Sequence, residues 1–143
     1  MTTTAPVNFY EHGGPIYAAF LAVEAEIAKA GIDESLHHLL LLRASQINGC
    51  GFCVKMHTGD ARKHGETNER LDRLVVWRHV DDYTPKEKAA FAWVEALTVV
   101  DAHADMGALR AALKKHFSDA EIAAITAISA MINLWNRIQI SQH

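Results

Sequence analysis

Apolar residues recur along the chain at helical spacing, three or four residues apart, and no alternating run is long enough to predict a β-strand. The clearest case is the segment over about residues 119–140, which has apolar side chains on several sides: Ile122, Ile125, Ile128, Met131, Ile132, Leu134, Trp135 and Ile138. A helix that is apolar all round is normally buried on every side. We therefore expect this helix to lie at the centre of the molecule or against another subunit.

Turn and capping residues divide the rest of the chain into further helices. Thr84-Pro85 and Ser118-Asp119 each precede a glutamate at the third helical position, which is the pattern of a capping box. The helices predicted upstream of the last one span about 15–30, 33–48, 50–64, 67–77, 84 to at least 97, and 109–117. The fold class is therefore all-α, a single-domain bundle of about six to seven helices over 1–143, with 1–14 as a loose N-terminal segment.

The composition fits one packed domain and excludes several classes of protein. The chain has 143 residues, of which 50% are apolar and 22% charged, and 14 Lys+Arg against 17 Asp+Glu give a net charge of -3. We expect no nucleic-acid partner, because the basic excess of such proteins is missing. No apolar stretch reaches the roughly 18–20 residues that cross a bilayer, and the N-terminus lacks the features of a signal peptide. These features predict a soluble, cytoplasmic protein.

The only two cysteines, Cys50 and Cys53, form a C-x-x-C motif. A disulfide between residues so close in sequence restricts the unfolded chain very little and so stabilises the fold little. In a cytoplasmic protein this spacing indicates redox chemistry or metal binding instead.

His57 completes a pattern that is typical of an activated cysteine. If a helix begins at Cys50, then Cys50, Cys53 and His57 lie on one face of it. The free N–H groups and partial positive charge of a helix start favour the thiolate. His57 can accept the thiol proton, and the second cysteine can convert an oxidised sulfur into a disulfide. In the competing interpretation all three are buried structural side chains.

The segment around these residues resembles a known family. Arg43-Ala44-Ser45-Gln46-Ile47-Asn48-Gly49-Cys50, followed by Cys53 and His57-Thr58, is similar to the core of the carboxymuconolactone decarboxylase superfamily, and more closely to its alkylhydroperoxidase AhpD-like branch. The likeness continues through Ala61-Arg62-Lys63, Arg70-Leu71, Trp77-Arg78 and Ala92-Trp93, and it ends with Ile132-Asn133 and Trp135-Asn136-Arg137. It covers most of the chain after about residue 15.

The resemblance implies an all-helical, AhpD-like fold that assembles into trimers or hexamers. It also implies a cofactor-free thiol peroxidase or disulfide reductase, with hydrogen peroxide or an organic hydroperoxide as substrate. Cys53 would attack the peroxide, Cys50 would resolve the product, and His57 would act in a proton relay. A dithiol, such as a lipoyl group on a partner protein, would restore the thiols. From the residues alone, either cysteine could attack first, because Cys50 is nearer the helix start while Cys53 has a histidine at i+4.

One position departs from the family pattern. The relay of the family usually begins with a glutamate twelve residues before the first cysteine, and this chain has His38 there. A histidine can pass protons but supplies no standing negative charge. Two neighbouring histidines would also lower each other's pKa. The substitution predicts a peroxidase that is weaker or shifted in pH, or another thiol reaction, unless His38 is simply a solvated or core residue.

Two alternatives belong to other functional classes. Cys50, Cys53, His57 and His38 together make a Cys2His2 set that would suit a structural or regulatory zinc ion. Alternatively, the protein is a redox-inactive helical oligomer that serves as a binding module, since a fold does not fix a function.

Among the aromatic residues, we expect Phe52 in the core or at a pocket entrance, and Trp77, Trp93 and Trp135 in core or subunit packing rather than in substrate contact.

Overall fold

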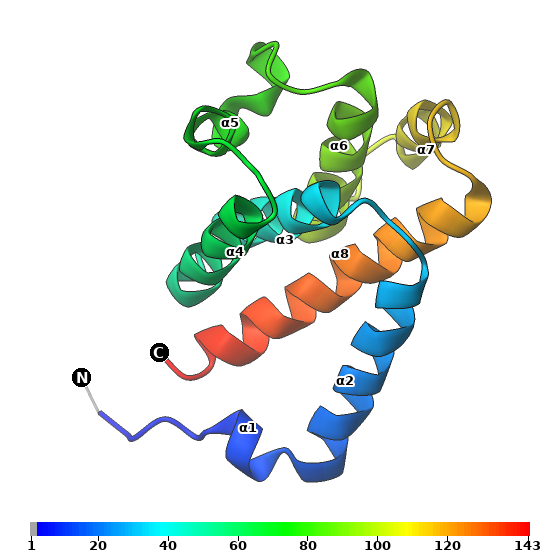
Figure 1. Cartoon of the computed structure of the whole chain (residues 1–143). Coiled ribbons are helices and arrows are strands. Elements are labelled where there is room, and N and C mark those ends of the chain that lie inside the picture. The colour runs from blue at the N-terminus through cyan, green and yellow to red at the C-terminus, as the bar shows by residue number, and fades with distance from the viewer. Residues whose placement is uncertain (1–2) are drawn as a thin grey trace.

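Helix α8 runs through the middle of the molecule, with α3, α4 and α6 on one side of it and α2 on the other (Figure 1). The computed structural model describes residues 3–143, and within them no β-strand occurs. The elements are α1 Phe9–His12, α2 Gly14–Lys29, α3 Glu34–Asn48, α4 Gly51–Lys63, α5 Asn68–Arg73, the 3₁₀ segment η1 Leu74–His79, α6 Pro85–Val99, α7 Met106–Lys114 and α8 Asp119–Ile140. The predicted all-α single domain is confirmed.

Helix α8 buries its apolar side chains within the chain itself. It packs against α3, α6 and α2, and Ile125, Ile128 and Ile132 are buried. The expectation of a central position is therefore correct. Phe91 of α6 and several leucines of α3 complete this core: Leu36, Leu39, Leu40 and Leu42.

Both predicted capping boxes form. The Thr84 and Ser118 side chains accept hydrogen bonds from the backbone N–H groups of Glu87 and Glu121, and each glutamate accepts one in return. Each box satisfies backbone donors that a helix start leaves free. The starts of α6 and α8 are thus determined locally by sequence.

The N-terminal segment that was expected to be loose contains a helix. Asn8 caps α1, because its side chain accepts hydrogen bonds from the N–H groups of Tyr10 and Glu11. Phe9 stacks on Phe20 of α2, so the aromatic side chains of α1 have partners. Residues 1 and 2 of the segment expected to be loose lie outside the described residues.

Two other boundaries differ from the prediction. Helix α7 begins at Met106 rather than at 109, because Asp105 caps it by accepting the N–H of Ala108. The helix predicted over 67–77 is α5 followed by η1, with an interruption at Val76, whose φ is -120°. In the described residues no helix is both long enough and apolar enough to cross a bilayer.

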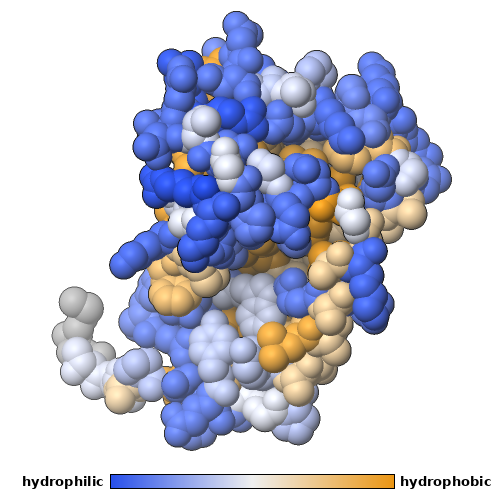
Figure 2. Space-filling model, in the orientation of Figure 1, coloured by the Kyte–Doolittle hydropathy of each residue, from blue (hydrophilic) through white to orange (hydrophobic). Residues whose placement is uncertain are grey.

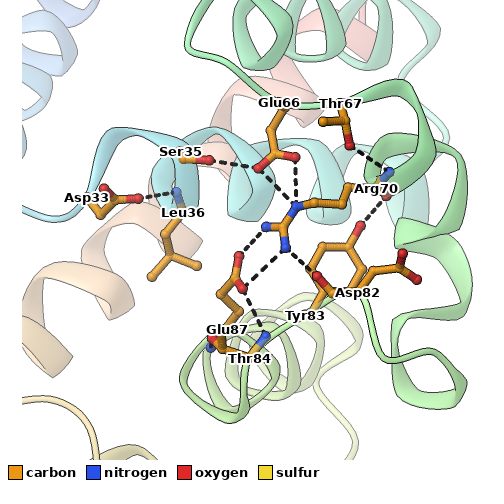
Figure 3. A network of polar contacts seen from close by, with 10 residues as sticks. All are labelled: Asp33, Ser35, Leu36, Glu66, Thr67, Arg70, Asp82, Tyr83, Thr84 and Glu87. Atoms are coloured by element: carbon orange, nitrogen blue, oxygen red, sulfur yellow. Dashed lines mark hydrogen bonds and ion pairs between the residues drawn. The ribbon is translucent and has the colours of Figure 1, made fainter.

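Arg70 of α5 links three parts of the fold (Figure 3). Its guanidinium donates hydrogen bonds to the carboxylates of Glu66 and Glu87, and the Tyr83 hydroxyl donates to the Arg70 carbonyl. Glu66 also accepts a hydrogen bond of 2.8 Å from the Ser35 hydroxyl of α3. The segment that follows α4 is thereby held against the first turn of α3.

Candidate active site

The turn between α3 and α4 presents the two cysteines. Gly49 ends α3 in a left-handed conformation, with φ at 69°, and the Cys50 N–H donates to the Ser45 carbonyl at 3.1 Å. Glycine adopts this conformation without strain. Cys50 is then the N-cap of α4 and has an extended backbone. The predicted break at Asn48-Gly49 and the predicted helix start are both found.

Cys50 and Cys53 form a disulfide, with Cα atoms 5.3 Å apart. Cys50 is fully buried and Cys53 is 3% exposed. The backbone N–H of Cys53 also donates to the Cys50 sulfur at 3.3 Å, which is the capping interaction of α4. The two sulfurs are thus close enough for redox cycling, and the structure shows the oxidised form.

Asparagines of α8 hold this turn in place. The Asn48 side-chain amide donates to the side-chain oxygens of Asn133 and Asn136, at 2.9 Å each. Asn136, which is fully buried, donates in turn to the Ser45 hydroxyl at 3.0 Å. Buried polar groups need such partners. The network therefore fixes the residues immediately before Cys50 relative to the central helix.

A cavity of about 430 Å³ opens beside Cys53. Figure 2 shows apolar surface in the hollow between the part of the molecule around α4 and the part around α1 and α2, with hydrophilic surface above. The lining comes from α1, α2, α3, α4 and α8 and includes Cys53 but not Cys50: Tyr10, Tyr17, Leu21, Glu24, Leu41, Phe52, Cys53, Met56, His57, Ile132, Trp135 and Gln139. Phe52 is 56% exposed and lies at the entrance, one of its two predicted positions.

His57 lines the same cavity and is 8% exposed. Its pKa is lowered to about 4, mainly by burial; Asp60 acts in the opposite direction, and the neighbouring His38 and His37 add to the lowering. The predicted mutual effect of the histidines is present, but desolvation is the larger cause. At neutral pH the His57 imidazole is therefore uncharged and can accept a proton. Within residues 3–143, no group hydrogen-bonds to its Nδ1.

His38 lies near His57, as the family resemblance implies, and Asp60 lies close to both. One ligand atom of each of these three side chains lies within 4.8 Å of the others. Burial lowers the pKa of His38, and His64 lowers it too. The carboxylate missing at position 38 is thus supplied nearby by Asp60, which sequence reasoning did not single out. The available signal was its position three residues after His57, on the same face of α4.

The structure does not assemble the Cys2His2 zinc set. Both sulfurs are bonded to each other and so present no thiolate to a metal. Among residues 3–143, the groups of side chains close enough to share an ion are Glu34–His38–His64 and His38–His57–Asp60, and neither contains a cysteine. Of the expected set, only the two histidines lie in a common group.

Sequence reasoning also missed part of the cavity wall. Trp135 packs against the core, as expected, but it also lines the cavity, and its indole N–H donates to Glu24 at 2.7 Å. Tyr17 contacts the Trp135 ring edge to face. Trp77 and Trp93, in contrast, are core residues, as expected. No local signal marks Tyr17 or Glu24, because α2 and the cysteine helix come to line one cavity only in the folded chain.

Comparisons with known proteins agree with the family resemblance and with the fold. The carboxymuconolactone decarboxylase family matches residues 15–96, more than half of the chain. The uncharacterized protein YdfG of Bacillus subtilis (strain 168) is 34% identical over 135 residues, which cover 94% of this chain and 92% of YdfG. The alkyl hydroperoxide reductase AhpD of Maricaulis maris (strain MCS10) is 39% identical over 49 residues, which cover 34% of this chain and 28% of that enzyme.

Solved structures share the whole fold. The protein ATU0492 of Agrobacterium tumefaciens, of unknown function and provisionally assigned to antioxidant defence as AhpD, superposes with a TM-score of 0.90. It is 34% identical, and the match covers 97% of this chain and 95% of that one. The debrominase Bmp8 superposes with a TM-score of 0.81 at 21% identity, covering 92% of this chain and 71% of that one, and at this identity it shows the fold alone.

Proposed function

The chain belongs to the carboxymuconolactone decarboxylase family, and on that premise we propose that it is a thiol-dependent peroxidase that reduces hydrogen peroxide or organic hydroperoxides through Cys50 and Cys53. One observation carries the proposal. Cys53 lines a cavity together with an uncharged histidine, while its disulfide partner is buried outside the lining. A substrate in the cavity thus meets one sulfur first, and the other sulfur is within bonding distance of it.

The first half of the cycle oxidises Cys53. In the reduced protein, neutral His57 accepts the Cys53 thiol proton, and the helix start stabilises the thiolate. The thiolate attacks the nearer peroxide oxygen, the O–O bond breaks, and sulfur becomes a sulfenic acid. The departing alkoxide or hydroxide takes the proton from His57 and leaves as an alcohol or as water.

The second half forms and then reduces the disulfide. The Cys50 sulfur attacks the Cys53 sulfenic acid, an S–S bond forms, and one water leaves. A dithiol reductant then exchanges with this disulfide, becomes a disulfide itself and returns both cysteines to thiols. A lipoyl group on a partner protein is a dithiol of this kind. The cycle needs a compartment that keeps such a dithiol reduced, which fits the cytoplasm.

Asp60 is positioned to support His57, and His38 lies close to both. A carboxylate near an imidazole favours its protonated form, so Asp60 stabilises the cation that forms when His57 takes the thiol proton. His38 opposes it only when His38 itself is charged, and burial disfavours that charge. Asp60 thus takes the place of the glutamate that the family pattern has at position 38, and an uncharged His38 does not oppose it.

We also infer that the chain forms a homo-oligomer, a trimer or hexamer as the family resemblance implies. Helix α2 supports this inference, because Ile27 is its only buried residue while Ile16, Leu21 and Val23 are 58%, 47% and 42% exposed. Apolar side chains gathered on one element in this way commonly cover an interface.

The test is a single turnover followed by turnover with a reductant. Reduced wild-type protein, Cys53→Ser and Cys50→Ser each receive one equivalent of cumene hydroperoxide, and thiols and peroxide are counted. We expect wild type to lose both thiols and one peroxide, with both thiols restored by dihydrolipoamide. Cys53→Ser should consume peroxide at least about 100-fold more slowly, because it lacks the attacking sulfur. Cys50→Ser should consume one equivalent and accumulate a sulfenic acid that dimedone traps.

The control is Ser141→Ala, which alters an exposed residue outside the cavity lining and should match wild type. Equal peroxide consumption by wild type and Cys53→Ser would contradict the proposed reaction. Unreactive thiols in a folded wild-type protein would leave the redox-inactive binding module as the better description.

A further inference from the structure

A second group of polar side chains lies where the first turn of α3 meets the end of α4. Glu34 and His38 are one turn apart on α3, and His64 caps the end of α4. The Glu34 Oε2 atom is 3.2 Å from His64 Nε2 and 3.5 Å from His38 Nε2. The rings of His38 and His64 are 4.4 Å apart between centroids. None of the three residues lines the cavity beside Cys53.

The hydrogen bond of His64 to the backbone directs its other ring nitrogen toward Glu34. The Nδ1 atom is 2.9 Å from the Asp60 carbonyl oxygen, and because a carbonyl oxygen only accepts, Nδ1 donates. The Nε2 atom is thereby left to face the Glu34 carboxylate at 3.2 Å. His38 Nε2 also faces this carboxylate and, among the described residues, has no hydrogen-bond partner.

One carboxylate oxygen of Glu34 and one ring nitrogen of each histidine lie within 4.8 Å of one another, so a single divalent metal ion can bind all three side chains. Zinc binds imidazole nitrogen and carboxylate oxygen at about 2.0–2.2 Å, so neighbouring ligands of a tetrahedral ion lie about 3.3–3.5 Å apart. The two distances from Glu34 are close to this value. We propose that Glu34, His38 and His64 bind a divalent transition-metal ion such as zinc, with water completing the coordination.

The surroundings support a binding site in two further ways. Metal-bound histidines usually donate the other ring N–H to a carbonyl or carboxylate, and His64 does this with Asp60. The side chains of Glu34 and His64 are 71% and 43% exposed, so an ion can enter from solvent. The ligand types favour zinc, nickel, cobalt or copper over magnesium and calcium, which prefer oxygen ligands alone.

The test uses untagged, disulfide-oxidised protein, so that no thiolate competes for the metal. Zinc chloride is titrated by calorimetry, and cobalt chloride is titrated by visible absorption, which reports imidazole and carboxylate coordination. We expect one equivalent of zinc to bind and the melting temperature to rise with zinc. His64→Gln and Glu34→Gln should each weaken binding at least about tenfold, since even the loss of a group that supports a ligand costs that much.

His103→Gln is the control, because this exposed histidine lies in the loop between α6 and α7, away from the group. It should bind zinc as wild type does. No zinc binding in wild type below about 1 mM would overturn the proposal. So would unchanged binding in His64→Gln combined with loss in His57→Gln, because the ion would then occupy the group formed by His38, His57 and Asp60.

Discussion

His57 is a buried histidine in the wall of a cavity, and this position decides its charge. Its pKa is lowered to about 4, mainly by desolvation. A neutral imidazole at pH 7 is a base, whereas an imidazolium would be an acid. Burial thus keeps His57 uncharged, with a lone pair that can accept a proton, and makes the ring a weaker base than an exposed histidine.

The same shift predicts a loss of stability in acid. A histidine in the unfolded chain has a pKa near 6.5. Between about pH 7 and pH 4, the unfolded chain therefore binds a proton at position 57 that the folded protein does not bind. The free energy of unfolding therefore falls as the pH falls through this range, by about 2–3 kcal/mol from His57 alone. Urea unfolding of the oxidised protein with EDTA, at pH 7.5 and 4.5, measures this fall.

His57→Gln removes the titrating group, so its stability should fall by about 2–3 kcal/mol less than that of wild type over the same range. The same acid-induced fall in both proteins would show that other groups cause it. The two proteins can be compared in this way if the urea midpoint changes with pH while the slope of the unfolding free energy against urea concentration stays the same.

At the scale of helices, the sequence predicts those ends where the capping residues act locally. Ser118 and Glu121 bond to each other's backbone, and no other part of the chain is needed for this interaction. Helix α1 is different. Its four residues are too few to form a stable helix alone. Its aromatic side chains are ordered by contact with α2, and the local sequence before residue 14 does not show this contact.

The end of α6 has an unfavourable residue. Val100 caps this helix with φ at 55°, the single non-glycine residue with positive φ among those described. A β-branched side chain is strained in this conformation, whereas asparagine tolerates it. We expect Val100→Asn to raise the free energy of unfolding by about 1 kcal/mol. Thermal and urea unfolding would measure it.

Val99→Asn is the matched control, because Val99 is also exposed but ends the helical part of α6. It should be neutral or slightly destabilising, since asparagine is no better than valine in a helix. A gain as large in Val99→Asn as in Val100→Asn would refute the assignment of the gain to backbone strain.

The contact between α3 and α8 depends on a buried amide. Asn136 bonds to both Asn48 and Ser45, so Asn136→Ala leaves the buried Ser45 and the half-buried Asn48 each short of a partner. We expect a loss of about 2–3 kcal/mol in the free energy of unfolding. Asn68→Ala, at an exposed position, should change it by less than about 0.5 kcal/mol. Similar losses in the two variants would argue against the network.

At the scale of the whole molecule, the site combines what sequence reveals with what it cannot. Cys50, Cys53 and His57 belong to one stretch of chain, so helical spacing alone places them together. His38 comes from the preceding helix and is placed beside them only by resemblance to the family. The opposite wall, with Tyr17, Glu24 and Trp135, depends on how α2 and α8 pack, and periodicity gives no information about which helices become neighbours.

The exposed face of α2 leads to the last prediction. Ile16 and Val23 are seven residues apart and so lie on one face of this helix, and both side chains are exposed. If this face is buried between subunits, the double variant Ile16→Lys/Val23→Lys places charges in an apolar interface and should dissociate the oligomer. Light scattering after gel filtration would then show wild type at about three or six times 15.8 kDa and the variant at 15.8 kDa or a smaller multiple than wild type.

Val99→Lys, which charges an exposed apolar position on α6, should keep the wild-type mass. A monomeric wild type would contradict the inferred oligomer, and an unchanged mass of the α2 variant would place the interface on another face.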